Sequence, residues 1–456
     1  MGFMDIAEQR FPGLSVYLQK RVLLILFLGF SSGLPLALSG STLLIWMTDR
    51  GVDLSTVGLF ALAGTPYTFK FLWAPVVDAW QMPVLSRLLG RRRGWLVFTQ
   101  LLLIATILWL ATLDPVTMAP YVALGAVLIA TASATQDIVI DAFRVESLED
   151  NEQAAGLALY VPAYRVALLV STAGAVGIVH ILEKSGVLPV QSWPWAYMAM
   201  AALVVVGLIA TLVAREPDMP EAGEQTEGEK SADAFRRLMA TAYESFHEFL
   251  TRDNAILVLV FVVVFKLCDA LAGVMTGPFV IDIGFDKGTY VEIVKGVGLI
   301  ALFLGGLAGG WVAKRLSMYQ ALWIAGIIQM TSNLVFSWQA MVGVDNWALT
   351  VTICVENFTG GIGTVIFLAY LSSLCSNALH TATQYALLSA LATFGRTTIS
   401  AGSGYIVKAT GWEAFFVITA LTGIPALLLL WWLKRRGHFS GDATNAGAGV
   451  RRAGAA

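Results

Sequence analysis

The chain has 456 residues, of which 57% are hydrophobic and 13% are charged, and its formal net charge is −2. Its mean hydropathy of +0.73 and sparse charge exclude an ordinary soluble domain, in which about 25% of residues are charged. The near-neutral balance also argues against a nucleic-acid partner. The sequence has no metal-ligand spacing, phosphate-binding loop or nucleophile elbow, so we expect no metal, no cofactor and no enzymatic activity.

About a dozen apolar stretches follow one another along the chain, separated by short polar joints. Each is long enough to cross a hydrocarbon layer of roughly 30 Å, which takes about 20 apolar residues in helical form. The stretches are too long for barrel strands, and backbone groups in lipid must be satisfied internally, so we predict twelve transmembrane helices in an all-α polytopic membrane protein. They begin near Val22, Ser55, Trp95, Ala119, Ala155, Trp195, Ala255, Tyr290, Tyr319, Trp347, Ala382 and Trp412.

Basic residues gather in alternate joints, as at Lys20 and Arg21, at 91–93, at 314–315 and at 434–436. By the positive-inside rule, both termini and the long middle loop are predicted to be cytoplasmic. The first apolar stretch has no small-residue cleavage site of the kind that follows a signal peptide. We therefore expect it to be a retained helix and not a signal peptide.

The sequence divides into two weakly similar halves of six spans. We predict a cytoplasmic N-terminal segment at 1–21, a six-helix half at 22–214, a cytoplasmic linker at 215–254, a second six-helix half at 255–433 and a flexible cytoplasmic tail at 434–456. An apolar stripe between Phe235 and Phe249 predicts a linker helix, either on the inner membrane surface or simply in solution. Repeated six-helix halves are typical of transporters, whose site lies at the interface of the repeats.

Ionisable residues inside the spans follow a pattern, since the third, sixth, ninth and twelfth spans have none. A charge at mid-bilayer costs at least about 2.5–3.5 kcal/mol unless it faces water or a partner. The four uncharged helices are therefore predicted to face lipid and the others to line a central cavity, which is the arrangement of the major facilitator superfamily. The charged positions are Lys70, Asp137, Asp141, Arg165, Lys266, Asp269, Lys295, Glu356 and Arg396.

Several of these positions have two interpretations. Lys266 and Asp269 are three residues apart on one helical face, so they either neutralise each other structurally or form a mid-membrane site. Asp137 and Asp141 share a face, which suits proton carriage, although Asp141 lies near the inner interface and can pair with Arg144 or the basic turn at 91–93. Asp78 is interpreted as a charge of an inner gating loop.

Several long segments resemble the AmpG muropeptide permease family, a branch of the major facilitator superfamily. They include GFSSGLPLALSGSTLLIWM, FKFLWAPVVDAW with GRRRGW, SATQDIVIDAF, FVVVFKLCDALAG, VENFTGGIGTVIFLAYL and TQYALLSALATFGR. The resemblance extends from about Val22 to Leu433, and a longer acidic linker departs from the family pattern. It implies a bacterial inner-membrane symporter that imports GlcNAc–anhydro-N-acetylmuramyl peptides with protons, for peptidoglycan recycling and, in many bacteria, β-lactamase induction.

The resemblance and the span positions together give a set of candidate residues. Asp137 is the first candidate for proton coupling and Asp269 the second, while Asp78, Asp141, Arg91 and Arg92 are expected to act in gating. A functional monomer that contacts anhydromuropeptide, protons and membrane lipid is expected. The alternatives are a transporter of another substrate such as acetyl-CoA, which favours a more basic cavity, and a non-transporting sensor. The expected substrate-binding residues are Lys266, Asp269, Glu356, Asn357, Arg396, Arg165, Gln136, Tyr67 and Gly33.

Overall fold

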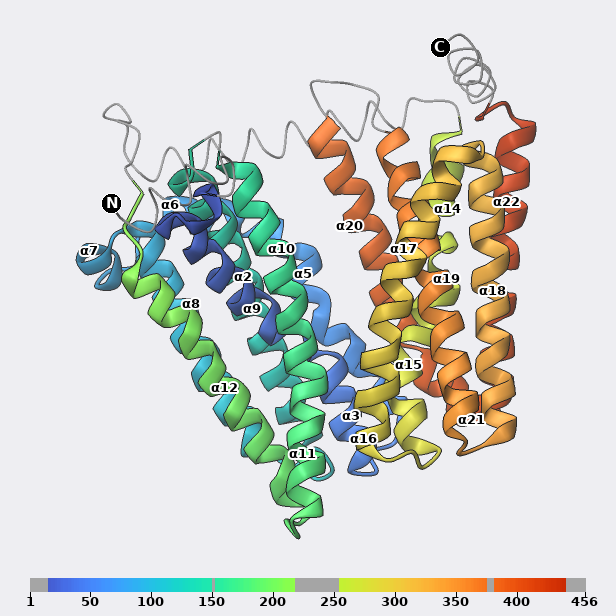
Figure 1. The fold of residues 1–456 in the computed structure, drawn as a ribbon, viewed down its shortest axis with the longest axis horizontal. Helices are drawn as coiled ribbons and strands as arrows, with labels where there is room; N and C mark the ends of the chain where they lie inside the picture. The colour runs from blue at the N-terminus through green and yellow to red at the C-terminus, as the bar shows by residue number, and fades with distance from the viewer. Residues whose placement is uncertain (1–14, 150–151, 218–253, 375–380, 440–456) are drawn as a thin grey trace. The chain divides into compact units, whose positions relative to one another are not determined.

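The computed structural model describes residues 15–149, 152–217, 254–374 and 381–439, and the elements in those ranges are helices (Figure 1). The chain forms two compact units. The first comprises Met1–Gly51 with Ala63–Arg236, and the second comprises Val52–Leu62 with Arg237–Ala456. The outer part of the second predicted span therefore belongs to the second unit. The predicted linker helix around 235–249 lies outside the described residues.

The first unit begins with the 3-10 turn η1 and continues through long helices joined by short ones. Its elements are η1 (Ser15–Leu18), α2 (Lys20–Ser39), α3 (Ser41–Asp49), the end of η2 (Phe60–Gly64), α5 (Thr65–Phe69), η3 (Lys70–Leu72), α6 (Ala74–Ala79), α7 (Leu85–Leu89), α8 (Arg91–Ala111), α9 (Ala119–Ser147), α10 (Gln153–Leu169), the π-helical turn η4 (Val170–Gly174), α11 (Ala175–Lys184) and α12 (Pro189–Val213).

The second unit contains a short helix from early in the chain and the long helices of the C-terminal half. Its elements are α4 (Leu54–Leu59), α14 (Ala255–Phe265), α15 (Leu267–Asp282), α16 (Lys287–Thr289), the π-helix η5 (Tyr290–Val297), α17 (Gly298–Arg315), α18 (Met318–Val342), α19 (Asn346–Ser373), α20 (Thr381–Ser400), α21 (Ser403–Leu421) and α22 (Ile424–Arg435).

Within the described residues, ten helical stretches are long and apolar enough to cross a membrane. The second predicted span is absent from the ten because prolines and glycines such as Pro66 and Gly64 divide it into pieces of at most six residues. The eleventh predicted span is interrupted after Ser400, where α20 ends. The boundary between the eleventh and twelfth predicted spans lies inside α21, at Gly411, whose φ of +78° is not helical. The all-helical, multi-pass fold is confirmed, whereas the count of twelve and the location of the termini remain predictions.

In the first unit, α2 packs along α10 at very short distance, while α8 and α12 run side by side (Figure 1). A Cβ atom on Gly33 would lie 2.4 Å from the Tyr164 carbonyl oxygen, and one on Gly29 would lie 2.7 Å from that of Tyr160. Only residues without a side chain permit this approach. The two glycines thereby hold the polar residues of α2 against α10.

In the second unit, α4 packs on α21. A Cβ atom on Gly404 would lie 1.8 Å from the Leu54 carbonyl oxygen, so the two backbones touch. Lys408 closes the contact by donating to Asp53 Oδ2 at 2.5 Å. The hydrogen bonds from Lys408 and from Ser55 hold the pKa of Asp53 at about 2, below its usual value.

The helices that correspond to the uncharged spans, α8, α12, α18 and α22, all expose large apolar side chains. Examples are Leu101 on α8, Ile209 on α12, Ile327 on α18 and Leu428 on α22, each about half exposed. Such surfaces suit contact with lipid. Their position relative to a central cavity remains a prediction.

Candidate functional site

The first unit has a buried polar cluster around Asp137, in the middle of α9. Ser32 of α2 donates its hydroxyl proton to Asp137 Oδ1 at 2.5 Å. Because that proton is used, the Tyr160 hydroxyl of α10 is the donor in its 2.9 Å hydrogen bond with Ser32 Oγ. Lys70 of η3 brings its ammonium to 3.7 Å from Asp137 Oδ2. One carboxylate therefore connects three helices and a 3-10 turn.

Asp137 and Lys70 differ in their access to water. The Asp137 side chain is 10% exposed, whereas the Lys70 side chain is 35% exposed. Burial makes a charged carboxylate costly unless it is paired and hydrogen-bonded, and both conditions are met here. Lys70 thus lies between the buried carboxylate and the exposed surface of this unit.

The other candidate residues of the first unit lie in different surroundings. Gln136 is fully buried and donates to Ser31 Oγ at 3.2 Å, which directs its amide into the α2 contact. The buried Tyr67 hydroxyl has no hydrogen-bond partner among the described residues. Arg165 is exposed on α10, and the described residues give it no ion pair. Gly33 is a packing residue in this structure, and a substrate contact by it stays a prediction.

The second unit has a polar cluster at Lys266 and Asp269. Lys266 Nζ lies 2.7 Å from Asp269 Oδ2 and 3.4 Å from the Thr364 hydroxyl of α19. Gln329 of α18 donates its amide to the same Asp269 oxygen at 2.8 Å. The structure therefore joins Lys266 and Asp269, as their spacing predicts, and adds neutral partners from two other helices.

A break in the seventh span creates this cluster. Lys266 ends α14 and precedes α15, and its backbone (φ −93°, ψ 5°) departs from helical geometry. Asp269 thus lies in the first turn of α15, where the helix dipole favours negative charge. A helix broken at membrane depth is tolerated where it is buried in protein or faces a cavity. Such broken helices supply the ion and substrate sites of many transporters.

Glu356 and Asn357 extend the polar region along α19. Asn357 donates its amide to Glu356 Oε2 at 2.7 Å and to the Ile353 carbonyl at 3.0 Å. Asp269 and Lys295 are both close enough to Glu356 to interact with it electrostatically. Two carboxylates and two ammonium groups of this unit therefore influence one another.

The predicted gating residues fall into separate contacts. Arg92 is 5% exposed and binds Glu146 through two hydrogen bonds of 2.6 and 2.9 Å, and Arg91 reaches the same carboxylate at 3.5 Å. Asp141 lies 3.9 Å from Arg144, one turn further along α9. This ion pair is the structural role that the sequence predicts as the alternative to proton carriage for Asp141. The side chains of Asp78 and Arg396 lie outside the described part of the molecule.

The residues of the two Lys–Asp clusters that sequence reasoning missed are neutral. Ser32, Gln329 and Thr364 each hydrogen-bond to a member of a charged pair, and Tyr160 hydrogen-bonds to Ser32. None of the four is ionisable near neutral pH. Gln329 lies in a stretch predicted to face lipid that also contains Thr331, Ser332 and Asn333, so its polarity alone does not single it out. Its amide points into the unit, so α18 has one face toward the cluster and another toward its surroundings.

The family becomes clear from comparisons of sequence and fold. The sequence model of the Major Facilitator Superfamily matches residues 25–384. A D-xylose–proton symporter shares the fold with a TM-score of 0.63 at 12% identity, over 91% of this chain and 97% of its own. A bacterial homologue of the lysosomal transporter Spinster gives 0.66 at 13% identity, over 95% and 98%. The chain therefore belongs to the major facilitator superfamily, a class of multi-pass membrane transporters.

Full-length relatives refine this assignment. The anhydromuropeptide permease of Escherichia coli K12 is 38% identical over 91% of this chain and 80% of its own length. A putative transporter of Rickettsia conorii, AmpG 4, is 31% identical over 92% and 98%. Within the superfamily, the chain is a member of the AmpG permease family, as its sequence segments predict. Since these relatives are permeases and transporters, the chain is a transporter and not an enzyme.

Proposed function

We propose that this protein imports GlcNAc–anhydro-N-acetylmuramyl peptides across a bacterial inner membrane by proton symport, as a monomer, and so supplies peptidoglycan recycling. The observation that carries the proposal is one Lys–Asp cluster at membrane depth in each unit. Intramembrane ionisable groups are costly and mark substrate or ion pathways. The permease relative at 38% identity supports the substrate class.

The cluster at Lys266 and Asp269 is proposed to bind substrate. A muropeptide has carboxylates, an amine and sugar hydroxyls. Lys266 offers a cation to a carboxylate, while Asp269, Glu356 and Asn357 offer acceptors and a donor to the amine and the hydroxyls. Binding of a substrate carboxylate to Lys266 releases Asp269 from its ion pair, and the Gln329 amide then remains as the partner of Asp269.

The cluster at Asp137 is proposed to carry the proton. Its carboxylate is buried, and its counter-ion, Lys70, is at the long distance of 3.7 Å. Protonation removes a buried charge at little structural cost, since Ser32 and Tyr160 remain to form hydrogen bonds. In this proposal, Arg91 and Arg92 with Glu146, together with Asp78, act on the predicted cytoplasmic side as gating contacts.

Uptake in vesicles tests the proposed function. Right-side-out vesicles that contain the protein receive radiolabelled GlcNAc–anhydro-N-acetylmuramyl tetrapeptide, with an imposed inward proton gradient or with a protonophore. We expect accumulation with the gradient and only equilibration without it. Excess unlabelled tetrapeptide should abolish the signal, and excess acetyl-CoA should leave it unchanged. Equal uptake by vesicles without the protein would contradict the proposed substrate. Accumulation that does not depend on the gradient would contradict proton symport but not the proposed substrate.

A further inference from the structure

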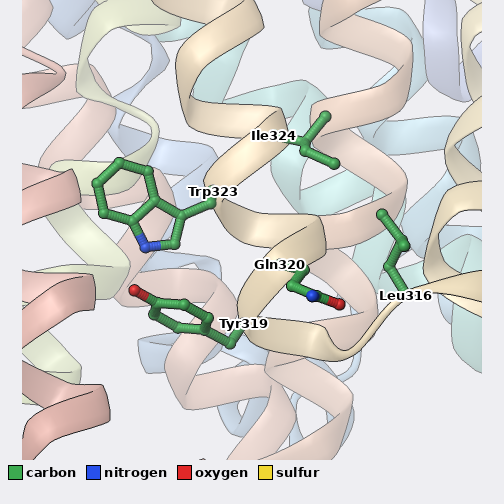
Figure 2. A pocket seen from close by; sticks show the side chains of 5 residues that line it. All are labelled: Leu316, Tyr319, Gln320, Trp323 and Ile324. Atoms are coloured by element: carbon green, nitrogen blue, oxygen red, sulfur yellow. The ribbon is translucent and has the colours of Figure 1, made fainter. Parts of the chain in front are cut away.

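A shallow groove lies on the surface of α18 near its N-terminus. It has a volume of about 350 Å³ and is lined by Leu316, Tyr319, Gln320, Trp323 and Ile324. In the view of Figure 2, the Tyr319 and Trp323 rings extend to the left of α18, and Leu316, Gln320 and Ile324 lie to the right. Its lining is mainly apolar, and exposed apolar residues such as Ile327 continue the surface along α18. A hydrocarbon chain fits such a surface better than water does.

Trp323, one of the residues that line this groove, has a polar group without a partner. The indole nitrogen of Trp323 is buried and has no acceptor among the described residues. Figure 2 shows this nitrogen and the Tyr319 hydroxyl directed toward the same side. A buried N–H group normally has a hydrogen-bond acceptor, because an unsatisfied one costs about 1–3 kcal/mol. The described residues therefore supply no acceptor for this N–H group.

Cations surround the same end of the groove. Lys314 and Arg315 directly precede Leu316 and are exposed, and the Lys434 ammonium of α22 lies 4.1 Å from the centre of the Tyr319 ring. Within the described residues, none of these three cations forms an ion pair with a carboxylate. Next to Lys434, Arg435 stacks on Trp431 at 3.8 Å. Basic side chains stacked on aromatic rings are typical of the ends of membrane helices, at the level of the lipid headgroups.

We propose that this groove binds one anionic phospholipid of the leaflet at the basic end of the second unit. The phosphate lies against Lys434 and Arg315, a lipid oxygen accepts the Trp323 N–H, and an acyl chain follows the apolar wall formed by Leu316 and Ile324. Basic pockets beside membrane helices bind anionic headgroups by the same combination of charge and apolar contact. The site is separate from both Lys–Asp clusters and does not depend on the transported substrate.

Native mass spectrometry of the purified full-length protein tests the site. The protein in detergent is titrated with dioleoyl phosphatidylglycerol or with dioleoyl phosphatidylcholine, and bound lipids are counted. We expect one phosphatidylglycerol to bind more tightly than any phosphatidylcholine. Lys434→Gln should weaken this lipid about fivefold, the effect of one basic side chain near a membrane surface. Trp323→Phe, which removes the N–H donor and keeps a smaller aromatic ring, should weaken phosphatidylglycerol binding while the protein stays folded.

A matched pair of variants locates the binding to the groove. Ile324→Trp fills the groove, whereas Ile327→Trp adds the same ring to the neighbouring exposed surface of α18. The first should remove the tight phosphatidylglycerol and the second should leave it in place. Equal binding by both variants overturns the proposal, as does equal retention of the two lipids by the parent protein. A dimer in lipid-free protein that Ile324→Trp dissociates and Ile327→Trp does not would show that a second copy fills the groove, and would also overturn it.

Discussion

Each of the two intramembrane aspartates has a lysine beside it and a neutral side chain that donates a hydrogen bond. Asp137 accepts from Ser32, and Asp269 accepts from Gln329. The neutral donors matter because a buried carboxylate that loses its counter-ion still needs hydrogen bonds to remain tolerable. Lys70 is 3.7 Å from its aspartate, whereas Lys266 is at 2.7 Å. The looser pair is the better candidate for a changing charge state.

The change Asp137→Asn tests the proton role. Asparagine keeps an oxygen that can accept from Ser32 but cannot ionise, so we expect accumulation driven by the gradient to fall at least tenfold while substrate exchange persists. Vesicle uptake and counterflow measure the two activities. Asp114→Asn is the control and should behave as the parent, because this partly exposed carboxylate between α8 and α9 lies only 3.7 Å from Arg50 at the end of α3, outside both clusters. Normal accumulation by Asp137→Asn would place the coupling residue elsewhere.

Lys266 and Asp269 call for a double change because a single change leaves a charge uncompensated. Asp269→Leu alone should lower the melting temperature, since Lys266, whose side chain is 14% exposed, loses its carboxylate partner. Lys266→Met with Asp269→Leu should recover stability but not transport. Thermal unfolding and vesicle uptake give the two readouts. If the double variant transports like the parent, the pair is only structural.

Before the structure, the charged members of both clusters could be predicted from the sequence, because any ionisable residue in an apolar stretch is conspicuous. Their neutral partners could not be predicted, since serine, tyrosine and glutamine are common in helix contacts. The pairing of Asp137 was also missed. Its near neighbour Asp141 suggested a partner on the same helix, whereas Lys70 comes from η3, 67 positions earlier in the chain.

At the scale of elements, the breaks in the helices determine where polar groups lie. The interruption at Lys266 places Asp269 in the first turn of α15, and the interrupted second span delivers Lys70 from a 3-10 turn. Proline and glycine in a membrane helix indicate where a break is possible. The conformation of the break depends on the neighbouring helices that satisfy the freed backbone groups.

The contact between α18 and α19 positions Gln329, and a glycine allows it. A Cβ atom on Gly363 would lie 2.0 Å from the Gln329 amide nitrogen. We therefore expect Gly363→Ala to displace that amide from Asp269 and to reduce substrate affinity several-fold. Gly360→Ala on the same helix is the control, since nothing lies within 4 Å of its added Cβ. Substrate binding to purified protein, measured by calorimetry, compares them.

A second variant separates displacement of the amide from general damage to α19. Gln329→Ala shortens the side chain at 329 and makes space for the Cβ atom that Gly363→Ala adds. The double variant should therefore be more stable than Gly363→Ala alone. Its substrate affinity should stay low because Asp269 still lacks the amide. Parent-like affinity in Gly363→Ala would show that Gln329 has no part in the site.

At the scale of the whole molecule, basic residues predict the orientation of both units. Lys20 and Arg21 begin α2, and Arg435 ends α22 with Arg436 directly after it, so the positive-inside rule predicts both termini in the cytoplasm. A C-terminal green fluorescent protein fusion should fluoresce, and a C-terminal alkaline phosphatase fusion should be inactive. An active phosphatase fusion would refute the predicted even number of spans.

The sequence by itself determined the membrane class, the all-helical fold and the family. These depend on the length and composition of apolar stretches and on long family segments, which are local properties of the chain. The tertiary structure decided which residues meet. It paired Lys70 with Asp137, placed Gln329 on Asp269 and assigned residues 52–62 to the second unit. Such contacts depend on close helix packing at glycines and on helix breaks, whose geometry is settled only when neighbouring helices supply the missing partners.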